Sequence, residues 1–442
     1  MVRNDLYVSS SGNDTTGYGT LTKPYATIQK AYNSANTTAT IKIMTSITQT
    51  TTINMNASKN ITLQSYSTTG TINSIIKGSV LTSYVVNQTT GTLNLKNITI
   101  DGNNIQSKDA MIRVASKMNM ENGTLITKAI DTDDNGGAIF IDGGILVMND
   151  GAITHNSSLA GGGAAVYICG NWTNESEGTF IMNGGTINHN GVDNASGGAI
   201  YNGGVLTISN GDISYNVNSI GNGGAILSHT KVTITGSTIN YNKTFMSGGA
   251  ISKTRGSDLI ISNSDISNNV ASQYGGAVAV YPDASNASVI DISGSTTIKN
   301  NMATNGGGIF VSNDSGNITL NIKGGTISGN KATTSSGGGI YAYGIVNMSA
   351  GTISGNTAYT FGGGLMCKTM CTMTGGIISG NTATNNNGGG ARVDGTFTLN
   401  GGIIRTNTAK ADGGISVASG ATYNFKKGTV TGNKPTNLYE TG

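Results

Sequence analysis

Short runs of alternating apolar and polar residues, separated by glycine, asparagine and aspartate, make up most of this chain. In the segment "AIFIDGGILVMNDGAITHN" at 138–156, the apolar residues Ile139, Ile141, Ile145, Val147 and Ile153 alternate with variable ones. Alternation over a few residues, interrupted by turn-forming residues, predicts short β-strands that bury one side. Three such runs follow one another before the pattern starts again, and none is long enough for a helix.

The pattern returns most often after about 25 residues, which indicates a stacked repeat architecture. One marker is a pair of glycines, whose second members are Gly137, Gly162, Gly198, Gly224, Gly249, Gly276, Gly307, Gly338, Gly363, Gly389 and Gly414. The other is an asparagine, at Asn156, Asn190, Asn216, Asn242, Asn269, Asn301, Asn330, Asn356, Asn381, Asn407 and Asn433. Three short strands cannot bury their own apolar face, whereas stacked triplets share a continuous core. The sequence therefore predicts an all-β fold, a single-stranded right-handed parallel β-helix with three strands per coil.

Both markers have structural explanations. The glycines are expected where the chain turns tightly into the first strand of a coil, which requires a positive φ or a close approach of the backbone. The asparagine recurs once per coil, so each copy is expected to lie about 4.8 Å from the next and to hydrogen-bond to it through the amides. Neither marker indicates catalysis.

The pattern divides the chain into four segments. Residues 1–39 hold a strand and a helix at 24–35, in which Ile28, Ala31 and Tyr32 share one face and cover the open end of the β-helix. Residues 40–135 form irregular coils and residues 136–433 regular ones, with inserted loops at 170–178 and 282–288. The tail at 434–442 departs from the repeat without an obvious cap, so we expect the natural chain to continue beyond Gly442.

Composition narrows the classes of function. Charged residues are 11% of the 442 residues and the net charge is +3, with no run of Lys or Arg among aromatic residues, so nucleic acid is not an expected partner. No apolar stretch approaches the roughly 18 residues of a membrane-spanning helix. The first residues lack the apolar core of a signal peptide. We favour a secreted or cell-surface protein whose leader precedes this chain over an intracellular one.

The three cysteines are too few for a disulfide framework. Cys367 and Cys371 either pair or lie near each other at a strand corner, or they act, like Cys169, as small buried apolar residues. We favour the last interpretation.

Two motifs resemble known families. The repeats "GGAIYN" at 197–202 and "TISGNTAYTFGGGL" at 352–365 resemble those of polymorphic outer-membrane proteins and related bacterial surface adhesins. The start, "YVSSSGND" with "GTLTKPYATIQKA", is similar to the N-terminal cap of many secreted pectate-lyase-like proteins. The resemblance covers nearly the whole chain and implies the fold more than a function, since this superfold hosts lyases, glycosidases, tailspikes and adhesins. The chain departs from the first family at Ile213, Ile353 and Ile378, where that family carries a Phe.

Alternation predicts two columns of outward side chains on the first strand of each coil. The first includes Phe140, Tyr201, Phe310, Tyr341 and Arg392, and the second Asp142, Tyr167, His229, Tyr281, Tyr343, Lys368 and Asp394. A groove lined by aromatic residues suits a sugar chain, and in pectate-lyase-like proteins this strand forms the substrate cleft. The predicted ligand-binding residues are therefore Phe140, Tyr167, Tyr201, His229, Tyr281, Phe310, Tyr341 and Tyr343, in a shallow groove that exposes Tyr201, Phe310 and Tyr341. Alternatively, these residues are strand formers that pack on one another or under a loop.

Charged residues offer two further candidate sites. Lys368, Arg392 and Asp394 are the candidate catalytic residues of a lyase, which needs a base and cationic groups or Ca²⁺ beside a uronate; an ion pair between coils explains them equally well. Asp131, Asp133 and Asp134, before a glycine turn, are candidate ligands of Ca²⁺, which is the one candidate cofactor. Aspartate is also common in turns.

We expect an adhesin-like domain that binds a glycan or a host or cell-surface protein. The alternatives are a polysaccharide lyase or glycosidase acting on an acidic polysaccharide, and a structural stalk or spacer of a larger surface protein.

Overall fold

The computed structural model describes residues 4–133, 136–170, 177–193, 197–255, 257–281, 287–312 and 318–440. These residues form a right-handed parallel β-solenoid with coils of about 26 residues, whose strands lie in three sheets, and one helix. The predicted fold class is confirmed. Across the described residues, no helix has the length and apolarity that crossing a membrane requires.

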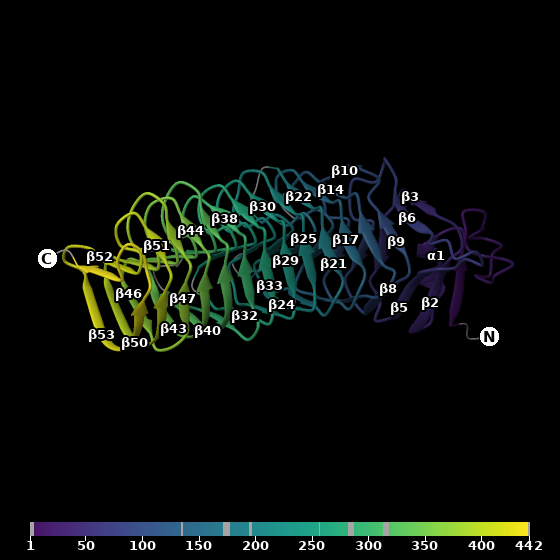
Figure 1. The fold of residues 1–442 in the computed structure, drawn as a ribbon. Coiled ribbons are helices and arrows are strands. Elements are labelled where there is room, and N and C mark those ends of the chain that lie inside the picture. Colours follow the sequence, from purple (N-terminus) through teal and green to yellow (C-terminus); the bar gives the residue numbers. More distant parts are fainter. Residues whose placement is uncertain are drawn as a thin grey trace. The chain divides into compact units, whose positions relative to one another are not determined.

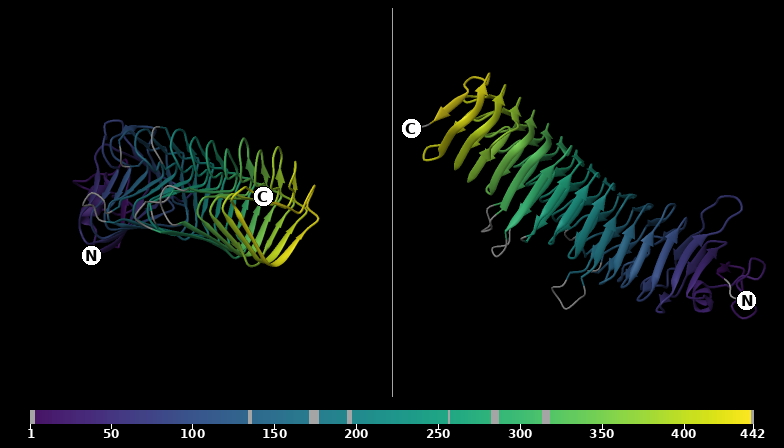
Figure 2. Two further views of the ribbon diagram at one scale, coloured as in Figure 1. Left: turned by 90° about the vertical axis from the view of Figure 1, so that its left-hand side faces the viewer. Right: turned by 90° about the horizontal axis from the view of Figure 1, so that it is seen from below.

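The chain divides into two compact units, unit 1 at Met1–Asp212 and unit 2 at Ile213–Gly442. Strand β25 (Asp212–Ser214) spans this boundary. Within each unit the strands of successive coils lie side by side in three parallel sheets, A, B and C (Figure 1, Figure 2). The predicted boundary between irregular and regular coils, at residue 135, falls inside unit 1.

In unit 1, sheet A holds two strands of most coils. The first series is β1 (Asp5–Val8), β2 (Thr38–Ile43), β5 (Asn60–Ser65), β8 (Thr92–Lys96), β12 (Lys117–Met120), β16 (Ile145–Met148), β20 (Thr179–Met182) and β24 (Val205–Ser209). The second is β3 (Ile47–Gln49), β6 (Ser74–Lys77), β9 (Thr99–Asp101), β13 (Leu125–Thr127), β17 (Ala152–Thr154) and β21 (Thr186–Asn188). Sheet B contains β4 (Ile53–Met55), β7 (Val86–Gln88), β11 (Ile112–Val114), β15 (Ile139–Ile141), β19 (Val166–Ile168) and β23 (Ile200–Asn202). Sheet C contains β10 (Gln106–Ser107), β14 (Ile130–Asp131), β18 (Ser157–Ser158) and β22 (Gly191–Val192).

Unit 2 repeats this arrangement. Sheet A contains β28 (Val232–Thr235), β29 (Thr238–Asn240), β32 (Leu259–Ser262), β33 (Asp265–Ser267), β36 (Ser288–Ser293), β37 (Thr297–Lys299), β40 (Ile318–Ser328), β43 (Ile345–Ser354), β46 (Met370–Met373), β47 (Ile377–Ser379), β50 (Thr396–Arg405) and β53 (Thr422–Thr431). Sheet B contains β27 (Ile226–Ser228), β31 (Ile251–Thr254), β35 (Val278–Tyr281), β39 (Ile309–Val311), β42 (Ile340–Ala342), β45 (Leu365–Cys367), β49 (Ala391–Val393), β52 (Ile415–Val417) and β54 (Leu438–Glu440). Sheet C contains β26 (Val217–Asn218), β30 (Lys243–Thr244), β34 (Val270–Ala271), β38 (Met302–Ala303), β41 (Lys331–Ala332), β44 (Thr357–Ala358), β48 (Thr382–Ala383) and β51 (Thr408–Ala409). The predicted tail thus adds one more strand, β54, to sheet B.

Stacked aliphatic side chains fill the core of each unit. In sheet B of unit 1, Ile112, Ile139 and Val166 are paired in register and completely buried. Each such residue contributes about 1.5–3 kcal/mol relative to an exposed one. The phase of one predicted run is wrong by one residue: in β16, Leu146 and Met148 are buried, whereas Ile145 is 41% exposed. The four consecutive apolar residues of that run give no alternation from which to choose a side.

The repeated asparagines form the predicted ladder. In unit 1, Asn156 Nδ2 donates to Asn190 Oδ1 at 2.9 Å. In unit 2 the same bond joins each asparagine from Asn216 to Asn433 to the next, for example Asn330 to Asn356 at 2.9 Å. The backbone N–H of Asn330 donates to the same Asn356 oxygen at 2.9 Å, and its Nδ2 also reaches the carbonyl oxygen of Ile298. These buried amides satisfy one another, so the asparagines have a structural role.

The paired glycines serve the two predicted purposes. At Gly248, φ is +72°, a left-handed conformation that glycine adopts without strain. At Gly249, a Cβ atom would lie 2.1 Å from the carbonyl oxygen of Gly276 in the next coil. Glycine therefore permits both the turn and the close stacking of coils.

The single helix, α1 (Ile28–Ser34), covers the N-terminal end of unit 1 (Figure 1). It packs against β1, β2 and β4 through buried Ile28, Ala31 and Tyr32, which confirms the predicted face. It begins later than predicted because Thr27 is its N-cap, with its hydroxyl accepting from the Lys30 N–H at 3.1 Å.

Candidate functional site

The outer face of sheet B in unit 1 carries a row of rings beside an ion pair. Strand register places Arg113, Phe140, Tyr167 and Tyr201 next to one another on β11, β15, β19 and β23. The Tyr167 and Tyr201 rings stack with centroids 4.6 Å apart, and Phe140 meets Tyr167 edge-on at 5.8 Å. We call these four residues, with Asp142, the unit 1 cluster.

Tyr167 therefore belongs to the first outward column, not the second as predicted. The reason is an extra glycine before β19. Gly163, with a φ of +70°, takes the structural place of Gly136, so Ala164 stands where Gly137 stands in the coil before. The prediction anchored this coil on Gly162, one residue too early, and therefore assigned Tyr167 to the wrong column.

Arg113 gives the unit 1 cluster its charge. Its Nε donates to Asp142 Oδ2 at 2.8 Å, and its Nη2 contacts the same oxygen. Its Nη1 donates to Asn87 Oδ1 at 3.2 Å, and Asn87 in turn donates to Asn54 at 3.4 Å. Amides, a guanidinium and rings thus follow one another along sheet B. Phe140 is buried, whereas Tyr167 and Tyr201 are partly exposed.

In unit 2 the corresponding face is closed. Phe310, Tyr341 and Met366 form a buried cluster, exposed by only 5%, 9% and 3%. Four partly buried rings pack over it, those of Tyr274, Tyr281, Tyr343 and Phe361. We call these seven residues the unit 2 cluster. The expected groove with exposed Phe310 and Tyr341 is therefore absent from the described part of unit 2.

The cover comes from residues that flank the strands. Tyr274, directly before a glycine pair, stacks on Phe310 with centroids 4.5 Å apart. Tyr281, at the end of β35, tilts against Phe310 at 6.0 Å and donates its hydroxyl to Ser247 Oγ at 2.7 Å. The Tyr341 hydroxyl donates to that of Tyr343 at 3.2 Å. This arrangement matches the alternative in which the aromatic residues pack on one another.

The candidate catalytic trio is an ion-paired network. Lys368 Nζ lies 2.7 Å from Asp394 Oδ2, and Arg392 Nε lies 2.8 Å from Asp394 Oδ1. Burial alone would raise the pKa of Asp394, but the hydrogen bonds from Lys368 and Arg392 outweigh it and hold this pKa below its ordinary value. The two cations also lie over rings, Lys368 over Tyr343 at 5.8 Å and Arg392 over Phe361 at 5.0 Å. Lys368 and Arg392 thus both pair with Asp394, as in the predicted alternative of an ion pair between coils.

His229 directly follows strand β27 in unit 2. Its Nδ1 is 2.5 Å from Thr254 Oγ1, and burial, with Arg255 and Lys253 nearby, lowers its pKa to about 4. Lys253, a residue that the sequence pattern did not single out, occupies a core position of β31 and is completely buried. Its Nζ donates to the carbonyl oxygens of Thr254 at 3.0 Å and Arg255 at 3.2 Å, and burial lowers its pKa to about 7.

The predicted Ca²⁺ ligands do not share one environment. Asp131 is completely buried, burial raises its pKa to about 7, and its Oδ2 has no hydrogen-bond partner among the described residues. Asp133 is exposed, and Asp134 lies outside the described residues. Over the described ranges, no three His, Cys, Asp or Glu side chains are grouped to hold a metal ion.

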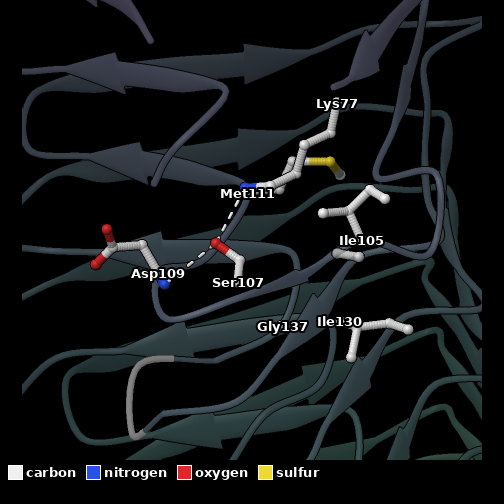
Figure 3. A pocket seen from close by; sticks show the side chains of 8 residues that line it. Lys77, Ile105, Ser107, Asp109, Met111, Ile130 and Gly137 are labelled. Carbon is white, nitrogen blue, oxygen red and sulfur yellow. Dashed lines mark hydrogen bonds between the residues drawn. The ribbon is translucent and has the colours of Figure 1, made fainter. Parts of the chain in front are cut away.

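Another buried lysine, Lys77, lines a small pocket in unit 1 that has no room for a water molecule (Figure 3). Its Nζ donates to Ser107 Oγ at 3.0 Å and to the Ser83 carbonyl oxygen at 2.5 Å. The Ser83 hydroxyl donates to Asp109 Oδ2 at 2.9 Å. Burial lowers the pKa of Lys77 to about 8. These hydrogen bonds join the segments around residues 77, 83 and 107. Lys77 therefore has a structural role.

Cys367 and Cys371 form a disulfide, so the favoured interpretation of these two as free apolar residues is wrong. Cys169 is buried, as expected. Residues 171–176 and 282–286, which make up most of the two predicted loops, lie outside the described residues.

Comparisons of the chain with protein-family models, curated proteins and solved structures gave no match.

Proposed function

We propose that this protein is a secreted or cell-surface binding domain that engages an extended polar ligand, a glycan in the first place, along sheet B of unit 1. The observation that carries this proposal is the partly exposed stack of Tyr167 and Tyr201 directly beside the Arg113–Asp142 pair. Rings next to charged and amide groups provide the mixture of contacts that sugars use. The resemblance to adhesin repeats points in the same direction.

The length and chemistry of the row support an extended ligand. From Asn54 to Tyr201 it covers six neighbouring strands, or roughly 24 Å at ~4.8 Å per strand. Because Tyr167 and Tyr201 cover each other's faces, we expect the ligand to meet ring edges and to hydrogen-bond to the guanidinium and amides. A low content of charge and the disulfide in unit 2 support an oxidising, extracellular location.

A glycan array screened with the full chain, with and without Ca²⁺, tests this proposal. We expect binding that weakens at least tenfold in Tyr201→Ala and in Arg113→Gln. Tyr359→Ala is the matched control, because Tyr359 is a half-exposed tyrosine of unit 2, directly after strand β44 of sheet C, and its loss should leave binding unchanged.

Two outcomes would contradict the proposal. Release of unsaturated uronate from a bound polysaccharide, abolished by Lys368→Ala, would favour the lyase. No bound glycan at all would favour the spacer or a protein ligand.

A further inference from the structure

Sheet C of unit 2 carries an exposed apolar surface that the proposed function does not use. Five large side chains in two consecutive coils are about half exposed: Tyr215 (48%), Val217 (42%), Ile220 (47%), Tyr241 (48%) and Phe245 (59%). Strand register pairs Val217 on β26 with Lys243 on β30, so the two coils present one surface. We call these five residues, with Lys243, the sheet C patch.

The two tyrosines occupy a strained backbone position. Tyr215 and Tyr241 have φ values of +55° and +53°, in the left-handed region that bulky residues avoid. Equivalent positions in later coils of unit 2 hold residues that mostly accept this conformation more easily: Asn268, Asn300, Gly329, Gly355, Gly380, Thr406 and Gly432. Asn or Gly would take this conformation with less strain, so the turn itself does not require the two rings. In unit 1 the equivalent positions hold His155 and His189, whose rings also stack, with centroids 5.1 Å apart.

The geometry of the rings indicates the kind of ligand. Tyr215 and Tyr241 stack with centroids 4.9 Å apart and planes 4° from parallel. They cover each other's faces and present edges, next to the aliphatic Val217 and Ile220. This surface lacks the guanidinium and carboxylate found in the unit 1 cluster. It suits apolar side chains of a protein better than the hydroxyl groups of a sugar.

The lysines of sheet C indicate the charge that a partner would carry. The outward column of sheet C in unit 2 runs through Val217, Lys243, Val270, Met302, Lys331, Thr357, Thr382 and Thr408, with two lysines and no carboxylate. Lys243 is exposed and forms no ion pair with any residue that the structure describes. A carboxylate supplied from outside would complete this surface.

We propose that the sheet C patch docks a protein partner that presents apolar side chains next to carboxylates. The tyrosine pair and Phe245 supply the apolar contact, and Lys243 binds the acidic group. This site is separate from the glycan row of unit 1, so either proposal stands without the other.

Selection of phage-displayed random dodecapeptides on the immobilised full chain tests the inference, followed by calorimetric titration of the best peptide. We expect selected peptides to combine Leu, Ile or Phe with Asp or Glu. Their affinity should fall at least tenfold in the double variant Tyr215→Asn/Tyr241→Asn and in Lys243→Glu. Tyr359→Asn, directly after strand β44 of the same sheet and outside the patch, should bind as the parent does.

The double variant also separates docking from a structural role. Because asparagine accepts the left-handed backbone, Tyr215→Asn/Tyr241→Asn should melt at the same or a higher temperature than the parent. A clear drop in melting temperature would overturn the proposal, because the rings would then stabilise the fold. Peptides without acidic residues, concentration-dependent self-association lost in the double variant, or binding only to vesicles of phosphatidylcholine and phosphatidylglycerol would also overturn it.

Discussion

The outer faces of sheet B in the two units both carry aromatic residues, but these residues pack differently. In unit 1, Phe140, Tyr167 and Tyr201 follow one another in one column, and two of the three rings stay partly exposed. In unit 2, rings from several positions converge on Phe310 and Tyr341 and bury them. In unit 1 the buried cluster on this face contains one ring, Phe140, with Ala110 and Cys169, whereas in unit 2 it takes in Phe310, Tyr341 and Met366. The residues that flank the strands make this difference.

The largest expected effect comes from opening the closed face. Phe310→Ala removes a ring that is 5% exposed, so we expect a loss of about 3–5 kcal/mol in the free energy of unfolding. Tyr201→Ala, the matched change in unit 1, should cost about 1 kcal/mol because its ring is partly exposed. Urea denaturation of both variants measures the difference, and equal losses would contradict the contrast between the faces.

The buried lysines provide a second comparison. Burial lowers the pKa of Lys253 to about 7, so between this pH and the unfolded value of about 10.4 the unfolded chain binds the additional proton. Stability should therefore rise with pH across this window. Lys253→Met should weaken that dependence, leaving the part due to Lys77, and stabilise the chain at pH 7 by about 1–3 kcal/mol.

Lys77→Met is the matched change in unit 1. It should gain less, because burial lowers the pKa of Lys77 only to about 8, against about 7 for Lys253. Urea denaturation at pH 7 and pH 9 distinguishes the two, and a pH dependence as steep in Lys253→Met as in the parent would argue against this assignment.

A smaller effect is expected from the ion-paired trio. The pKa of Asp394 is lower in the folded than in the unfolded chain, so its contribution is fully present above the unfolded value of about 4 and is lost as the pH falls through the folded value. Asp394→Asn should cost about 1–2 kcal/mol at pH 7, by leaving Lys368 and Arg392 without their counter-charge. Thermal melts from pH 7 to pH 3 should show less acid sensitivity in the variant. An unchanged acid transition would contradict the assignment.

The repeat made the fold predictable, whereas the candidate site depends on individual residues that do not follow the repeat. Eleven glycine pairs and eleven asparagines gave the coil, the asparagine ladder and the parallel sheets. The side chosen in β16 could not be predicted, because Leu146 and Val147 are equally apolar. The closure over Phe310 depends on Tyr274, which forms an isolated β-bridge with Asn305 and lies outside any alternating run. Arg113 was missed because it precedes the regular repeats, and Lys253 because a lysine at a core position contradicts the pattern.

The most direct test of the central claim compares the two faces in one binding experiment. The best glycan from the array would be titrated calorimetrically into the parent chain, Tyr201→Ala and Tyr343→Ala. We predict at least a tenfold loss of affinity in Tyr201→Ala and parental affinity in Tyr343→Ala. Parental affinity in Tyr201→Ala together with a loss in Tyr343→Ala would contradict the account, since the ligand would then bind the face that the structure closes.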